Sequence, residues 1–168
     1  TDVVGGHVDR ERRESIQRTA ESVASKVDPG KVGKLKGNIS DLESPEYQSI
    51  RTVLQKINDS MPKIVCIYLM GQRNGGELFF FVDTEGDVRE GMSNRAPAQP
   101  GEMYSDVTEP LLRAFRGETV TDGPATDEWG TFVSARVPLM DPKTGQCIAV
   151  FGMDFDARDW IWDVADHA

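Results

Sequence analysis

The residue types that most often perform catalysis are scarce in this sequence and badly placed for it. Its two histidines are His7 and His167, which lie at opposite ends of the 168-residue chain. A serine or cysteine nucleophile needs an adjacent base, usually an imidazole, to activate it. No Gly-x-Ser-x-Gly, phosphate-loop or His-Glu-x-x-His motif occurs either. The sequence therefore predicts a domain with no catalytic residues.

Metal and disulfide chemistry have little support. Residues 83–87, Asp-Thr-Glu-Gly-Asp, begin like a calcium loop, but Gly falls at the fourth position instead of the sixth. Cys66 and Cys147 both lie in apolar runs, and two cysteines cannot form a structural zinc site alone. We expect no metal and no cofactor. The cysteines are expected to be buried thiols, with a disulfide between neighbouring strands as the alternative.

The charge balance excludes one class of partner. The formal net charge is −9, from 19 basic and 28 acidic side chains, so the surface repels phosphate backbones and anionic lipid headgroups. The longest apolar runs, Ile64–Met70 and Cys147–Met153, have seven residues each, far fewer than the roughly 20 that cross a bilayer. We expect one domain over residues 1–168, no nucleic-acid partner, and membrane attachment only through flanking segments outside this sequence.

Helical spacing of apolar residues marks two segments near the start. Ile16, Ala20 and Val23 belong to a pattern that predicts a helix over 8–27, ended by Asp28-Pro29-Gly30. A polar linker follows to about residue 41. Ser44 and Pro45 suit the N-cap and first position of a second helix over 44–61.

After Pro62 the pattern changes to that of strands rich in β-branched and aromatic residues. The predicted strands cover residues 63–70, 77–83, 119–121, 129–139 and 146–155. Residues 84–105 have little periodicity and predict a long loop, followed by a short helix at Leu111–Phe115. Asp156 can cap a last helix over 156–168. Antiparallel hairpins flanked by helices predict an α+β domain with its sheet within 63–155.

Two long stretches resemble the Cache (PAS-like) sensor domains that precede histidine kinase, diguanylate cyclase or chemoreceptor output modules. One is PEYQSIRTVLQKINDSMPKIVCIYLMGQRNGGELFFFVDTEGD, around Tyr47–Asp83; the other is DEWGTFVSARVPLMDPKTGQCIAVFGMDFDARDW, from Asp127 to Trp160. The resemblance covers roughly residues 10–162. It implies a PAS-like five-stranded antiparallel sheet in the order 2-1-5-4-3, between a long N-terminal helix and a C-terminal helix that both lead to membrane spans.

The resemblance also implies a place for a ligand. Sensors of this kind hold a small molecule between one face of the sheet and a long loop with a short helix, here residues 84–118. The candidate ligand-binding residues on this analogy are Tyr68, Phe81, Asp83, Tyr104, Asp127, Trp129, Ser134 and Arg136.

Four of these candidates, apart from Asp127, have open alternatives. Tyr68 could be a core tyrosine with a satisfied hydroxyl. Phe81 shares a strand face with Phe79, and either face of that strand could be core. Asp83 could cap a turn. Arg136 suits a carboxylate, but a solvated arginine at the sheet edge is the alternative.

On the same resemblance, Asp127 and Trp129 are candidates for contact with a ligand amine. In amino-acid-binding Cache relatives an Asp at a similar place pairs with the ligand amine, and the face of Trp129 could contact the same cation. Asp127 could instead be a turn residue, and the Arg-x-Trp-Tyr motif of those relatives is missing before Arg95. Ser134 and Arg136 have opposite parity to Trp129, so the three cannot all face one pocket.

These expectations define a functional hypothesis. The chain is expected to be the extracytoplasmic sensor domain of a cell-membrane receptor, binding a carboxylate, an amine or an amino-acid-like molecule and signalling to a histidine kinase, within a homodimer. The alternatives are a diguanylate cyclase or chemoreceptor output, or a dimerisation module that binds no ligand. Asp154, inside the last apolar strand, is expected to be structural.

Overall fold

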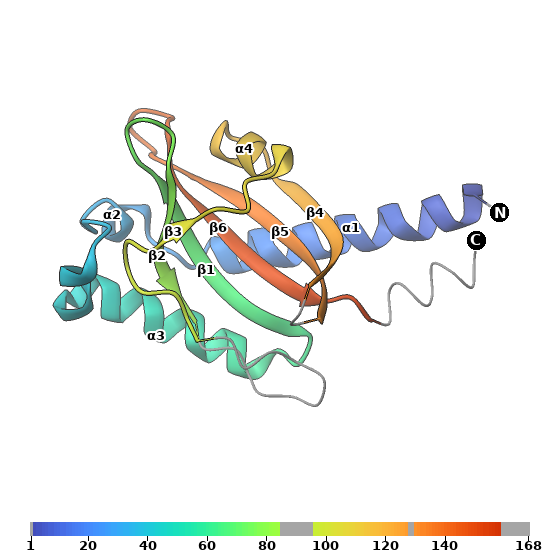
Figure 1. Cartoon of the computed structure of the whole chain (residues 1–168), viewed down its shortest axis with the longest axis horizontal. Coiled ribbons are helices and arrows are strands. Elements are labelled where there is room, and N and C mark those ends of the chain that lie inside the picture. The colour runs from blue at the N-terminus through green and yellow to red at the C-terminus, as the bar shows by residue number, and fades with distance from the viewer. Residues whose placement is uncertain (1, 85–95, 128–129, 159–168) are drawn as a thin grey trace.

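The computed structural model describes residues 2–84, 96–127 and 130–158 (Figure 1), and these form an α+β structure around one antiparallel sheet. The sheet has six strands in the order β3-β2-β1-β6-β5-β4. The strands are β1 (Ile64–Gln72), β2 (Leu78–Asp83), β3 (Met103–Tyr104), β4 (Val120–Asp127), β5 (Gly130–Met140) and β6 (Cys147–Asp156). The helices are α1 (Asp2–Ala24), α2 (Pro29–Val32), the 3-10 helix η1 (Ile39–Glu43), α3 (Pro45–Ser60) and α4 (Glu109–Phe115).

The α+β class with an antiparallel sheet is confirmed, but the prediction of five strands is wrong. β3 lies at the edge of the sheet, where Tyr104 pairs with Leu78 and Met103 with Phe79. Two residues are too short for a sequence pattern, so this strand was expected to be loop. β4 has eight residues, where only 119–121 were predicted, because Gly123 and Pro124 argue against a strand. The structure accommodates them in a register shift between Asp122 and Ala125.

The helices differ from the prediction mainly at their ends. α1 ends at Ala24, and Asp28 caps α2 by accepting a hydrogen bond from Gly30 N at 2.9 Å, so the predicted linker contains α2 and η1. The second predicted helix is confirmed as α3, with Ser44 Oγ accepting from Tyr47 N at 3.0 Å. Asp156 ends β6, and its Oδ1 accepts a hydrogen bond from Arg158 N at 3.1 Å, as the predicted helix cap would; residues 159–168 of the predicted C-terminal helix lie outside the described part of the chain.

Two apolar layers pack on opposite faces of the sheet. Ile67 and Leu69 of β1 join α1 and α3 in one core, whereas Tyr68 and Met70 face a second core that includes Leu111 of α4. Successive side chains of a strand alternate between faces, so β1 supplies both cores. Figure 1 shows α1 passing behind the sheet and β3 on the nearer side. We refer to the α1 and α3 side as the helix face, and to the other side as the cavity face.

The described residues contain no helix that is both long enough and apolar enough to cross a bilayer.

Candidate functional site

A cavity of about 340 Å³ opens on the cavity face, beneath the segment that links β3 to α4. It is lined by Tyr68, Phe80, Tyr104, Asp106, Thr108, Asp122, Gly123, Ala125, Phe132, Ser134, Arg136 and Asp154. This volume falls within the range of about 300–1,000 Å³ that is typical of small-molecule sites. The lining combines aromatic rings with a few convergent charged groups, which is the usual composition of a specific pocket.

Strand alternation brings the polar residues of the lining together. Ser134 and Arg136 are two positions apart on β5 and so share a face. Ser134 is opposite Asp154 of β6, while Arg136 and Tyr68 of β1 are both opposite Gly152 of β6. A Cβ at Gly152 would lie 2.1 Å from Cε2 of Tyr68, so the absence of a side chain there makes room for the tyrosine ring.

Asp154 is the acceptor at the base of the cavity. Its Oδ1 accepts hydrogen bonds from Tyr68 Oη at 2.8 Å and from Ser134 Oγ at 2.7 Å. Its Oδ2 accepts one from Cys66 Sγ at 3.3 Å. These bonds fix the Tyr68 hydroxyl and satisfy the half-buried carboxylate with three protein donors.

Arg136 is held just as firmly. The residue is 4% exposed, its Nε donates to Tyr68 Oη at 3.1 Å, and its Nη1 lies 3.4 Å from Asp122 Oδ2. Burial alone lowers the pKa of Arg136, but Tyr68, Asp154 and Tyr104 outweigh burial and hold that pKa above its ordinary value. The guanidinium is therefore charged and already engaged with an anion.

The hydroxyls of the cavity remain protonated at neutral pH. Burial raises the pKa of Tyr68 well above its usual value, and it also raises the pKa of Tyr104. Asp122 accepts a further hydrogen bond, from Thr108 Oγ1, which joins the N-cap of α4 to β4.

The charges of the lining do not cancel. Asp106, Asp122 and Asp154 contribute three carboxylates, against the single guanidinium of Arg136. Because charges in a low-dielectric cleft act strongly on an incoming ion, such a lining attracts a cation and repels an anion. The arrangement suits a small molecule with a protonated amine.

Four of the eight predicted site residues line this cavity: Tyr68, Tyr104, Ser134 and Arg136. The prediction for Phe81 is wrong with respect to this cavity. Phe81 packs against Phe79 on the helix face, with ring centroids 4.8 Å apart, and Phe80, which points to the other face, lines the cavity instead. Asp127 ends β4 and its side chain is not described. Trp129 lies outside the described residues.

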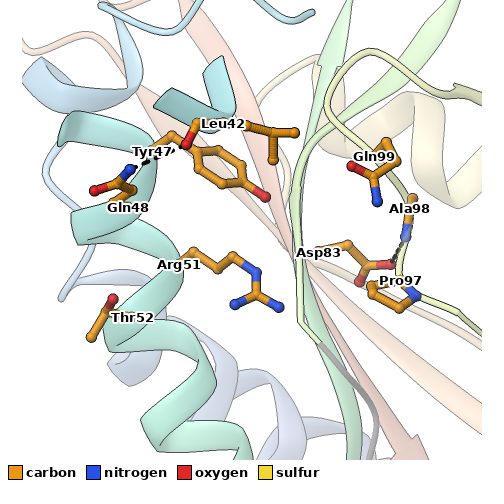
Figure 2. A pocket seen from close by; sticks show the side chains of 9 residues that line it. All are labelled: Leu42, Tyr47, Gln48, Arg51, Thr52, Asp83, Pro97, Ala98 and Gln99. Atoms are coloured by element: carbon orange, nitrogen blue, oxygen red, sulfur yellow. Dashed lines mark hydrogen bonds between the residues drawn. The ribbon is translucent and has the colours of Figure 1, made fainter. Parts of the chain in front are cut away.

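Asp83 lines a different cavity, of about 320 Å³, at the edge of β2 between α3 and residues 97–99 (Figure 2). Its Oδ2 accepts a hydrogen bond from Ala98 N at 2.8 Å, as the figure shows, and Arg51 of α3 extends from the other side. Burial raises the pKa of Tyr47, which also lines this space. Asp83 thus lines a different cavity from Tyr68, Tyr104, Ser134 and Arg136.

Several lining residues were not among the predicted ones: Phe80, Asp106, Thr108, Asp122, Phe132 and Asp154. Phe132 could have been found, because it continues the alternation of Ser134 and Arg136. Asp122 gave no signal, since it precedes a Gly-Pro pair that reads as a turn. Asp154 was expected to be structural, and it both holds Tyr68 and lines the cavity.

Neither cysteine forms a disulfide with the other: Cys147 Sγ donates to Ala149 O at 3.2 Å, and Cys66 Sγ donates to Asp154. Within the described residues, no three His, Cys, Asp or Glu side chains are grouped so as to hold a metal ion.

Comparison with known proteins identifies the fold. No protein-family model matches the chain, and none of the curated proteins matches its sequence. The ligand-binding domain of the Campylobacter jejuni chemoreceptor Tlp3 in complex with L-valine aligns with a TM-score of 0.55 at 14% identity, over 99% of this chain and 61% of that one. The sensory domain of Tlp3 with isoleucine bound gives 0.53 at 15% identity, over 99% and 60%.

These values bear on the fold alone. The chain has the fold found in the sensory domain of this chemoreceptor, and it spans about three fifths of the length of those domains, 61% and 60% in the two alignments.

Proposed function

We propose that this chain is the extracytoplasmic ligand-binding domain of a membrane-bound signalling receptor, and that it binds a small molecule with a protonated amine. The observation that carries the proposal is the acidic cavity of the cavity face, in which three carboxylates stand against one guanidinium. The fold shared with the Tlp3 domains, whose structures contain L-valine and isoleucine, supports a sensory role.

The state of Arg136 decides between the ligand classes considered. A ligand carboxylate would have to compete with Asp122 for a guanidinium that is 4% exposed. A ligand amine meets Asp106 at the exposed rim and Asp122 deeper in, and neutralises part of their repulsion. The aromatic rings of Phe80, Tyr104 and Phe132 would contact the apolar part of the same molecule.

The test uses three molecules that share an isobutyl group: L-valine, isobutylamine, which lacks its carboxylate, and isovalerate, which lacks its amine. We expect the two amines to raise the melting temperature and isovalerate to leave it unchanged, because binding to the folded state adds RT ln(1 + [L]/Kd) to stability. Stabilisation by isovalerate alone would overturn the amine assignment. If no natural amino acid and no small primary amine binds by calorimetry, the sensor proposal is wrong.

A matched pair of variants locates the binding site. Asp122→Asn removes one carboxylate from the lining, and we expect the affinity for isobutylamine to fall about tenfold, corresponding to about 1.4 kcal/mol. Asp59→Asn makes the same change on α3, outside the cavity, and should leave the affinity unchanged. Equal affinities in the two variants would show that the amine binds elsewhere.

For the whole receptor we infer a sensor histidine kinase within a homodimer, with this domain outside the cytoplasm and itself without catalytic activity. Ile16 of α1 packs against a small cluster of Val133 and Ala157, the latter being the first residue after β6, so the entering helix and the leaving strand come together on the helix face. That arrangement suits a domain inserted between two membrane spans.

The alternative output, a chemoreceptor signalling domain, is favoured by the fold shared with Tlp3. The gene sequence downstream of this domain decides between them: a kinase core supports the first and a methyl-accepting coiled coil supports the second. A diguanylate cyclase domain at that place would contradict both. Analytical ultracentrifugation of the receptor's complete extracytoplasmic part tests dimerisation.

A further inference from the structure

Arg13 of α1 reaches the edge strand β4 from the helix face of the sheet. Its Nη2 donates to Gly123 O at 2.7 Å and its Nη1 donates to Thr121 Oγ1 at 3.1 Å. Its Nε donates to Asp9 Oδ2, one helical turn earlier, at 2.7 Å. The Arg13 side chain is 28% exposed, so the planar guanidinium bridges α1 and β4 in a partly desolvated position.

The two residues that Arg13 holds are the sequence neighbours of Asp122. Because side chains alternate along a strand, Thr121 meets α1 on the helix face while Asp122 enters the cavity on the other face. There Asp122 accepts the hydrogen bond from Thr108 and the ion pair from Arg136. Arg13 therefore holds β4 from the helix face, at the residues next to Asp122, and the carboxylate of Asp122 lies in the cavity on the other face.

The backbone of β4 is irregular at this point, so its position depends on contacts such as those with Arg13. β4 is an edge strand, and its pairing with β5 shifts register between Asp122 and Ala125, so Gly123 and Pro124 fall outside the regular ladder. Gly123 has φ +101°, and a Cβ there would lie 2.9 Å from Phe132 O. The Gly123 carbonyl lies in this irregular stretch, and Arg13 supplies it with a hydrogen-bond donor.

We infer that Arg13 is a positioning residue, which fixes Asp122 in the cavity and couples occupancy of the cavity to the position of α1. The coupling half of this inference rests on the proposed function, whereas the positioning half concerns the unliganded domain. Coupling between two places is reciprocal: if an amine on Asp122 alters β4, it biases α1, and a change in α1 alters the affinity for the amine by the same factor.

Hydrogen exchange of the unliganded domain tests the positioning half. Arg13→Gln should raise the exchange rates of the amides of residues 121–123 and 125–126 at least tenfold and leave those of β1 and β6 unchanged. Arg13→Lys, which keeps the charge but not the fork, should lie between. The control is Arg18→Gln on an exposed position of the same helix, which should match the wild type. Unchanged rates in β4, or an equal rise in all strands, would overturn the inference.

Adding isobutylamine or L-valine at a fixed concentration tests the coupling half. In the wild type we expect protection both in the cavity strands and in residues 9–16 of α1. In Arg13→Gln the cavity strands should still be protected, with about tenfold weaker affinity, and the protection of α1 should disappear. Protection of α1 that survives in Arg13→Gln would contradict the coupling.

The two failures are distinguishable. If neither compound protects any segment of the wild type, the proposed function fails and the coupling falls with it, while the unliganded comparison still decides whether Arg13 positions β4.

Discussion

Asp154 accepts hydrogen bonds from side chains of two neighbouring strands, Tyr68 and Cys66 on β1 and Ser134 on β5. One carboxylate thus ties three strands together on the cavity face. A hydrogen bond to a charged acceptor contributes about 1.5–3 kcal/mol, more than one between neutral groups. The same carboxylate gives the cavity part of its negative charge, so structure and binding depend on one residue.

Replacing Asp154 and Asp106 in turn distinguishes a carboxylate that stabilises the fold from one that only lines the cavity. We expect Asp154→Ala to lower the free energy of unfolding by about 2 kcal/mol or more, since two hydroxyls lose their acceptor. Asp106→Ala removes an exposed carboxylate from the same cavity and should stay within about 0.5 kcal/mol of the wild type. Urea unfolding of both variants gives the two values. Equal stability of the two would refute the structural role of Asp154.

Residue-level prediction from the sequence selected cavity-lining residues where a polar side chain interrupts an apolar strand. Tyr68 and Arg136 stand out in this way, and both line the cavity. It failed for Phe81, because the sequence left open which face of that strand is core, and in the structure Phe79 and Phe81 both lie on the helix face. It missed Asp122, because this residue reaches the cavity on an irregular edge strand. That strand is held by its pairing with β5 and by the hydrogen bonds from Arg13.

At the scale of elements, the pairing of β1 with β6 depends on one glycine. Gly152 lies opposite Tyr68, and a Cβ at Gly152 would come within 2.1 Å of Cε2 and 2.4 Å of Cζ of that ring. The glycine therefore leaves room for the Tyr68 ring while the two central strands stay in register. In this position the Tyr68 hydroxyl is hydrogen-bonded to both Asp154 and Arg136.

Gly152→Ala should displace the Tyr68 ring and lower the free energy of unfolding by about 3 kcal/mol, at the upper end of overpacking costs. The matched control is Gly33→Ala. Gly33 has φ −62°, and a Cβ there would be 3.5 Å from its nearest neighbour, so the change should be neutral or stabilising by a few tenths of a kcal/mol.

A double-mutant cycle decides the cause. In a Tyr68→Ala background the ring is gone, so Gly152→Ala should cost much less than in the wild type. If it costs the same in both backgrounds, as measured by urea unfolding, the clash with Tyr68 is not the reason for the glycine.

The helices and strands with the clearest sequence signals were predicted best. α3 has an N-cap serine, a proline at its first position and a regular apolar face, and its prediction was close at both ends. β3 has only two residues, and β4 contains Gly and Pro, so tertiary pairing decides both. The strands that were missed or shortened are the two edges of the sheet, where local propensity is weakest.

At the scale of the whole molecule, the tyrosines are distributed over both apolar cores, one on each face of the sheet. Tyr47 belongs to the core on the helix face, Tyr68 to the core on the cavity face, and Tyr104 packs against the latter. These are all three tyrosines of the sequence. Burial is the largest cause that raises the pKa of each above the ordinary value of 10.0.

This common direction predicts alkaline unfolding. A tyrosine whose pKa is raised by folding contributes stability that is complete below pH 10.0, the unfolded value, and is lost as the pH rises toward the folded value. Each tyrosine that ionises only in the unfolded chain lowers the free energy of unfolding by about 1.4 kcal/mol per pH unit in that window. Tyr68 contributes most, because burial raises its pKa furthest, while the charge of Arg51 opposes the rise in the pKa of Tyr47 and that of Arg136 opposes the rise in the pKa of Tyr104.

Absorbance at 295 nm, which follows tyrosinate, should therefore stay low in the native protein above pH 10 and rise together with the loss of helical circular dichroism. Tyr68→Phe removes the largest of the three contributions, so its free energy of unfolding should fall less steeply above pH 10 than that of the wild type. Tyr104→Phe serves as the control and should reduce the slope by a smaller amount. Tyrosinate that forms near pH 10 while the circular dichroism is still native would show that Tyr68 is accessible to solvent. The cavity would then be too open to exclude water from its charges.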